Sequence, residues 1–197
     1  EGGAIIGYPS RPDADPAEGP TPEHALLDTG DFLIRRGARV ALLGPNGSGK
    51  TTFLRTILGE IEPLRGRVRL GASVKIGYLP QKQDWLDPDR SALDAVLDAK
   101  RMELEAARNV LGRFLFSGDD VYKRIGDLSG GERSRVALAI LTLQGANFLL
   151  LDEPTTHLDV ASQEILQSVL DGFDGTILLV SHDRYLIDAM ATHVWMV

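Results

Sequence analysis

The chain has 197 residues, no cysteine and a formal net charge of −7 at neutral pH. Its length suits one large domain or a domain with an inserted subdomain, and the lack of cysteine excludes disulfides and cysteine-bound zinc. No apolar run reaches the roughly 18 residues that span a bilayer and no signal pattern opens the chain, so we expect a cytoplasmic protein without membrane insertion. The negative charge disfavours long-range attraction to nucleic acid and leaves only local contacts with it.

The first 24 residues differ in composition from the rest. Five of the ten prolines lie within the first 22 residues, in “YPSRPDADPAEGPTP”. Such a segment cannot pack a core, so we predict a proline-rich linker or mobile segment over residues 1–24. The chain starts without methionine and ends in “HVWMV”, which is typical of a strand, and we expect it to be part of a longer protein.

From Ala25 onward, short apolar stretches bounded by turn residues alternate with stretches of helical periodicity. This alternation predicts an α/β fold with a largely parallel sheet covered by helices, whose ligands gather at the carboxyl ends of the strands. The predicted strands are “ALLDTGDFLI”, “RVALLG”, “GRVRL”, “SVKIGYLP”, “NFLLLDEP” and “TILLVSHD”. The predicted helices are “KTTFLRTIL”, which ends at Gly59, then “GERSRVALAILTL”, and the stretch through Ile165 and Phe173.

The chain turns helical between Trp85 and Asp127. Ser91 and Asp94 form a capping-box pattern, and apolar residues then recur at roughly helical spacing. We therefore predict a helical subdomain over residues 84–133, inserted into a core made of residues 25–83 and 134–197. The recurring apolar residues are Leu93, Val96, Leu97, Leu104, Ala107 and Leu111.

The stretch “GPNGSGKT” satisfies G-x-x-x-x-G-K-[ST] between an apolar strand and a helix. Unpaired N–H groups at a helix start bind phosphate at the positive end of the helix dipole. We expect Lys50 to reach the β and γ phosphates of a nucleotide and the Thr51 hydroxyl to ligate Mg²⁺. The alternative is a glycine-rich turn with a solvated lysine. The predicted phosphate-binding residues are Gly44, Pro45, Asn46, Gly47, Ser48, Gly49, Lys50, Thr51 and Thr52.

Further polar residues follow predicted strands. Asp152 ends the buried run “FLLLDE” and can hold Mg²⁺, while Glu153 points to the other side and can polarise an attacking water. A solvated turn is the alternative for this pair. His182 in “LLVSHD” either binds the γ phosphate or bonds a backbone carbonyl at a strand end. Gln81 in “YLPQ” is a surface glutamine unless the fold brings it near Mg²⁺.

The stretch “LSGGERSRVALA”, residues 128–139, places a serine and two glycines at a second predicted helix start. The glycines let the backbone approach an anion and the helix dipole favours it, which predicts a second anion-binding corner. An ordinary serine-capped helix start has the same geometry.

Arg65, Arg67 and Arg69 alternate along “LRGRVRL” and would share one face of a strand. That face is either solvated or in contact with RNA phosphates.

Together these stretches resemble the nucleotide-binding domain of the ATP-binding cassette (ABC) superfamily. The resemblance runs from about Ala25 to Val197 and rests on “GPNGSGKTT”, “YLPQ”, “LSGGE”, “FLLLDEP” with “HLD”, and “VSHD”, in that order. It implies a P-loop NTPase core with a largely parallel sheet, an antiparallel β portion and an inserted helical subdomain. It also implies ATP and Mg²⁺ as cofactors.

The resemblance further implies a role for each matching residue. Two such domains pack head to tail, so the signature motif of one closes over the γ phosphate held by the other. The implied catalytic residues are Glu153 as general base, His182 as γ-phosphate contact and Gln81 as sensor of Mg²⁺ and water. The implied metal residues are Thr51, Gln81 and Asp152, and the implied contacts with a partner's ATP are Ser129, Gly130, Gly131 and Asp159.

Within the superfamily, “LSGGERSRVALA”, “LLLDEPTTHLD”, “VSHDRYLID” and “GRFLFSGDDVYKRIGDLSGG” are most similar to the second cassette of the ABC-F group. Glu132 stands where transporter cassettes usually carry glutamine. The group pairs two cassettes on one polypeptide, lacks membrane domains and acts mostly on ribosomes, in translation control or antibiotic resistance. The implied partners are a second cassette, on the same polypeptide or in a homodimer, and the ribosome with its RNA.

Two departures from the group pattern concern Thr156, which stands where asparagine is usual, and the adenine-stacking aromatic. “PAEGPT” contains no aromatic, and Tyr8 is the only one before Phe32. Two other functions stay open. One is the nucleotide-binding subunit of a membrane transporter, with residues 85–127 forming part of a groove for the membrane domain. The other is an ATP-dependent interaction module with incidental hydrolysis.

Overall fold

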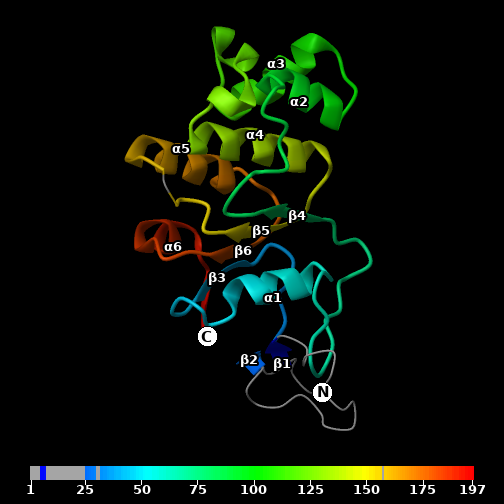
Figure 1. Cartoon of the computed structure of the whole chain (residues 1–197), viewed down its shortest axis with the longest axis vertical. Coiled ribbons are helices and arrows are strands. Elements are labelled where there is room, and N and C mark those ends of the chain that lie inside the picture. Colours follow the sequence, from blue (N-terminus) through cyan, green and yellow to red (C-terminus); the bar gives the residue numbers. More distant parts are fainter. Residues whose placement is uncertain (1–4, 8–24, 30–31, 157) are drawn as a thin grey trace.

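Five parallel strands form the central sheet of the computed structural model, in the order β4-β5-β6-β3-β7 (Figure 1). The structure describes residues 5–7, 25–29, 32–156 and 158–197. All four neighbouring pairs in this sheet run parallel, which confirms the predicted α/β fold. The strands are β3 (Arg39–Leu43), β4 (Ile76–Leu79), β5 (Phe148–Asp152), β6 (Thr176–Val180) and β7 (His193–Met196).

Both faces of this sheet are covered, which explains the unbroken apolar runs of its central strands. β5 and β6 are buried along their whole length. Phe53 packs against one face together with Leu150 and Leu178, whereas Leu151 and Leu179 point to the other. The first face carries α1 (Lys50–Ile57), and the second carries α4 (Gly130–Leu143), α5 (Val160–Asp171) and α6 (Arg184–Met190) (Figure 1).

A group of short helices extends beyond α4, on the side away from the sheet (Figure 1). α2 (Ala92–Ala99) and α3 (Leu104–Arg113) pack on each other and on α4, so the predicted periodicity belongs to two helices. The Ser91 hydroxyl caps α2 by accepting the Asp94 N–H at 3.0 Å. Two 3₁₀ turns, η2 (Gly118–Tyr122) and η3 (Ile125–Asp127), return the chain to α4.

Arg135 anchors these helices to α4. It is buried, and its guanidinium donates to the carbonyl oxygens of Phe114 and Leu115, both at 3.1 Å. The guanidinium also lies 4.9 Å from the ring centroid of Phe116. Leu115 has a φ of 63°, a strained value for leucine, and Arg135 holds the carbonyls of this turn.

A second, two-stranded sheet lies on the α1 side (Figure 1). β1 (Ile5–Gly7) pairs antiparallel with β2 (Ala25–Asp28), which supplies the antiparallel β portion of the fold. The Ile6 side chain is fully buried in the cluster around Phe53. The segment predicted as a linker therefore contains one strand. Residues 8–24, including Tyr8, lie outside the described residues.

The predicted strand “GRVRL” is wrong. Residues 66–70 form no strand, and Gly66 has a φ of 79°, outside the β region. The alternation of Arg67 and Arg69 is that of a strand, but no described strand lies alongside to take their backbone hydrogen bonds. Likewise, among the described residues of “ALLDTGDFLI”, the strand is limited to Ala25–Asp28.

Candidate functional site

The predicted phosphate loop connects the carboxyl end of β3 to the start of α1. Gly47 and Gly49 have φ values of 83° and 92°, in the left-handed region that glycine adopts without strain. Among the described residues, no side chain caps α1 at Gly49, so the first N–H groups of the helix are open to an anion. The structure thus places residues 44–52 as a turn and a helix start that can surround phosphate oxygens.

The Lys50 side chain folds over this loop. It is buried, and its Nζ donates to the carbonyl oxygens of Gly44 and Pro45, each at 2.8 Å. These acceptors are neutral, so they hold the ammonium group in place without cancelling its charge. An anion entering the loop would meet a positioned cation.

Thr51 and Asp152 meet across α1 and β5. The Thr51 hydroxyl donates to Asp152 Oδ2 at 2.9 Å. Asp152 is buried, and this desolvation raises the pKa of its carboxyl, opposed by the Thr51 hydrogen bond and the Lys50 charge. Alternation along β5 explains the encounter, because Leu150 and Asp152 share the face that α1 covers.

These two groups fit Mg²⁺. A hydroxyl and a carboxylate are oxygen ligands of the kind that Mg²⁺ takes, usually together with substrate phosphates and waters. The described residues contain no cluster of three or more His, Cys, Asp or Glu side chains that could hold a metal by themselves. Thr51 and Asp152 therefore suit an ion that arrives with a nucleotide.

Glu153 follows at the end of β5, beside His182 at the end of β6. Burial raises the pKa of the Glu153 carboxyl, and the nearby His182 lowers it. The His182 Nε2 lies 3.4 Å from Glu153 Oε1, and the His182 N–H donates to Oε2 at 3.4 Å. Glu153 Oε1 is buried without a hydrogen bond to any described residue, and Glu153 has a φ of 49°. A buried carboxylate oxygen that has an imidazole nearby but no hydrogen bond to a described residue, on a strained residue, suits a group that accepts a proton from a bound water.

Gln81 lies two residues beyond β4, the neighbour of β5 in the sheet. Its side chain is exposed and makes no hydrogen bond to a described residue. The structure therefore places Gln81 at the same edge of the sheet as Asp152 but without a hydrogen bond to Thr51 or Asp152.

The second predicted corner is a complete capping box at the start of α4. The Ser129 hydroxyl accepts the Glu132 N–H at 3.2 Å, and Glu132 Oε2 accepts the Ser129 N–H at 2.8 Å. The hydroxyl proton of Ser129 is not used in this box, so it remains available for an anion.

The start of α4 packs closely on the start of α5. A side chain at Gly131 would meet Ser162 Cβ and Oγ at 2.6 Å. Asp159 caps α5 by accepting the Ser162 N–H at 2.7 Å, and this hydrogen bond lowers the pKa of its carboxyl. Ser129 and Asp159, which the sequence separates by 30 positions, thus begin two neighbouring helices.

The two corners lie on opposite faces of the sheet (Figure 1). α1 packs on β1 and β5, whereas α4 packs on β4, α2, α3 and α5. The phosphate loop and the Ser129 corner therefore do not surround one common pocket.

A family model described as “ABC transporter” matches residues 27–156, which is more than half of the chain. The chain belongs to the ABC family. The predicted resemblance is thereby confirmed, and this ABC cassette contains the phosphate loop and the two carboxylates within the matched range.

Curated relatives place the cassette near the ABC-F group. It is 45% identical over 176 residues to the ATP-binding protein Uup of Haemophilus influenzae, covering 87% of this chain and 27% of that protein. It is 41% identical over 178 residues to the energy-dependent translational throttle protein EttA of Escherichia coli, covering 87% of this chain and 32% of that protein. The chain thus spans about a quarter to a third of these relatives.

Solved cassettes share the fold. The dimeric ATP-binding cassette MJ0796, bound to ADP and Pi, superposes with a TM-score of 0.72 at 23% identity, over 96% of this chain and 90% of that one. Within the described part of the cassette, no helix combines the length and apolar character needed to cross a membrane.

Sequence reasoning missed Tyr78 in the cassette. Tyr78 lies on β4 opposite Leu150, close enough to Asp152 for each side chain to shift the pKa of the other. Burial, followed by the negative charge of Asp152, raises the pKa of Tyr78 to about 12, so the phenol keeps its proton. No motif singles out this tyrosine, because its position depends on β4 pairing with β5.

Proposed function

We propose that this chain is a Mg²⁺-dependent ATPase cassette that works as half of a head-to-tail pair. One observation carries the proposal: Lys50, Thr51, Asp152 and Glu153 gather from α1 and β5 at the carboxyl ends of the parallel strands. This is where open α/β sheets bind ligands, and the donors and acceptors of these four residues match a nucleoside triphosphate with its metal.

Each group has one task in the proposed hydrolysis. The loop N–H groups and Lys50 bind the phosphates, and Thr51 and Asp152 would hold Mg²⁺, which would neutralise charge on the phosphate oxygens. Glu153 accepts a proton from the attacking water, because its buried Oε1 has no hydrogen bond to a described residue and Glu153 lies near Lys50 and Asp152. His182, 3.4 Å from that oxygen, orients the water and contacts the γ phosphate.

The Ser129 corner serves the nucleotide of a partner cassette. Its place on the opposite face from α1 supports this, because Ser129 is remote from the loop of its own chain. Asp159, at the start of the adjoining helix, lies at the same edge and would contact the partner.

The cellular role that we propose is a cytoplasmic clamp on the ribosome that ATP closes and hydrolysis reopens. Support comes from the likeness to EttA, whose name describes a translational throttle, at 41% identity over most of this chain. The likeness to MJ0796 at 23% identity concerns the fold and does not favour transport over translation.

A Glu153→Gln variant tests the catalytic proposal. Gln preserves the size of the side chain but cannot take the proton, so hydrolysis in the presence of the partner cassette should fall at least a hundredfold. ATP should then hold the pair together, as measured by light scattering. Unchanged phosphate release would reject Glu153 as the base, and a variant that never pairs in ATP would reject the clamp.

A further inference from the structure

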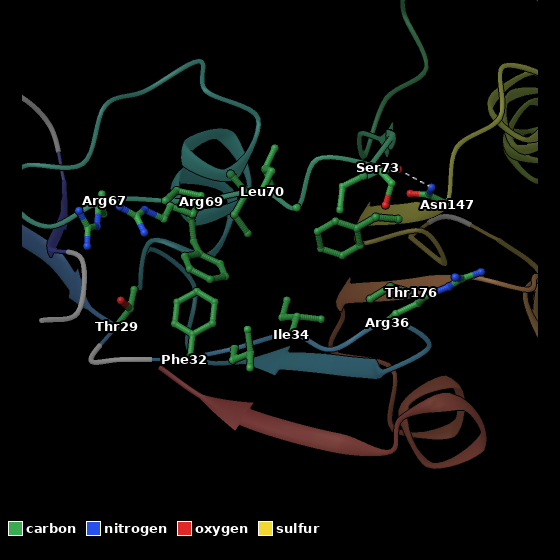
Figure 2. Close-up of a pocket in the computed structure, with 18 of the residues that line it drawn as sticks. Thr29, Phe32, Ile34, Arg36, Arg67, Arg69, Leu70, Ser73, Asn147 and Thr176 are labelled. Atoms are coloured by element: carbon green, nitrogen blue, oxygen red, sulfur yellow. Dashed lines mark hydrogen bonds between the residues drawn. The ribbon is translucent and has the colours of Figure 1, made fainter. Parts of the chain in front are cut away.

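A cavity of about 400 Å³ lies beside α1, and Figure 2 shows residues that line it. Its walls include Phe148 and Thr176, the first residues of β5 and β6, and Ile57, the last residue of α1. The phosphate loop lies at the carboxyl ends of the strands, and a five-residue strand such as β5 spans roughly 17 Å. This cavity, the α1 cavity, is therefore separate from the ATP site.

Three exposed arginines line the α1 cavity: Arg36, Arg67 and Arg69. None of them forms a hydrogen bond or ion pair with a described residue, and Asp174 is the only acidic side chain in the described lining. Arg67 and Arg69 lie at one end of the cavity in Figure 2 and Arg36 lies at the other. In a chain of net charge −7, these arginines form a local excess of positive charge.

Between Arg67 and Arg69 at one end and Arg36 at the other, apolar and aromatic side chains line the cavity. Phe32 lies below Arg69 in Figure 2, between the Arg67 and Arg69 pair and Ile34, and is 40% exposed. Its ring is fixed by contacts with Phe53 and Trp195, at centroid distances of 5.2 and 4.9 Å. Leu70, which is 48% exposed, adds apolar surface beside the arginines.

We propose that the α1 cavity binds an unpaired segment of RNA, with a base against Phe32 and backbone phosphates on Arg67, Arg69 and Arg36. Arginines without a carboxylate partner among the described residues supply the phosphate contacts, and a fixed, exposed ring supplies the stacking surface that any base matches. An acidic peptide would satisfy the arginines but would not need the aromatic ring beside Arg69. This inference rests on the proposed ribosomal role and names an RNA contact for it.

The test measures binding of a labelled single-stranded oligouridylate to the whole chain by fluorescence anisotropy at several salt concentrations. The variant Arg67→Ala/Arg69→Ala should bind at least about tenfold more weakly. Its slope of log affinity against log salt concentration should be shallower by about 1.4, that is about 0.7 per lost phosphate contact. The matched control Arg101→Ala/Arg113→Ala removes two exposed arginines of the helical region and should bind like the wild type.

A second variant tests the aromatic contact. Phe32→Leu keeps an apolar side chain of similar size but removes the ring, and we expect about tenfold weaker binding of the same RNA. Polyglutamate should compete poorly, because it offers charge without bases.

Three results would overturn the inference: no RNA binding by the wild type, equal losses in both double variants, or polyglutamate binding as tight as RNA. ATP binding is measured on the same preparations and should not change, because the arginines lie outside the ATP site. Failure of RNA binding with hydrolysis intact rejects this inference alone, whereas failure of hydrolysis with the partner cassette rejects the proposed function.

Discussion

Replacing Gly131 with alanine tests whether the second corner is built by close contact between α4 and α5. The added Cβ would lie 2.6 Å from Ser162 Cβ, about 1 Å inside ordinary carbon–carbon contact. Such overpacking costs about 1–3 kcal/mol, reduced by roughly 0.5–1 kcal/mol because alanine favours a helix over glycine. We expect a net loss of about 1–2 kcal/mol in the free energy of unfolding, measured with urea.

The adjacent glycine provides the control. A Cβ at Gly130 would meet Leu158 Cδ2 at 3.6 Å, an ordinary contact, so Gly130→Ala should be neutral or slightly stabilising. Ser162→Gly removes the atoms that the new Cβ meets. In the double variant Gly131→Ala/Ser162→Gly, the free energy of unfolding should therefore exceed the sum of the single effects by at least about 1 kcal/mol. The reasoning fails if both alanine variants have the same stability, or if the cycle shows no coupling.

Two further predictions concern the carboxylates of β5. Tyr78→Phe removes the phenol that lies beside Asp152 and lowers the pKa of its carboxyl, and the Mg²⁺ concentration needed for fluorescent ATP analogue binding should rise about tenfold, whereas Tyr122→Phe, at an exposed tyrosine, should change nothing. An unchanged Mg²⁺ requirement would contradict the role of Tyr78. Burial raises the pKa of Glu153 in the folded state, so folding takes up a proton between the ordinary and the raised pKa, and stability falls as pH rises through that window. Glu153→Gln cannot ionise and should be more stable than the wild type at neutral pH, with the difference vanishing below about pH 4 in thermal unfolding. A stability difference that persists below about pH 4 would show that ionisation of Glu153 is not its cause.

Local pattern predicts most of the fold because the signals are strong where burial is complete. The runs that became β5 and β6 are apolar on both faces, and no other environment suits them. Residues 66–70 show the limit, because their alternation resembles a strand although the partner that a strand needs is missing among the described residues. Arg135 shows a second limit, because nothing in its sequence spacing indicates that its guanidinium donates to the carbonyl oxygens of Phe114 and Leu115.

The same limit applies to the site. The loop pattern fixes Lys50 and Thr51 locally, and the end of an apolar run indicates Asp152. Their contact, at 2.9 Å between the Thr51 hydroxyl and Asp152, depends on α1 covering one particular face of β5, which is a tertiary property. The phenol of Tyr78 and the packing of Gly131 on Ser162 depend likewise on which elements become neighbours.

Binding of a fluorescent ATP analogue to the isolated chain tests most directly whether the Ser129 corner serves a partner's nucleotide. Lys50→Ala should weaken binding at least tenfold, because it removes the cation of the phosphate loop. Ser129→Arg should bind the analogue like the wild type, because its side chain lies on the opposite side of the sheet from α1. If Ser129→Arg weakens binding as much as Lys50→Ala does, the head-to-tail account is wrong.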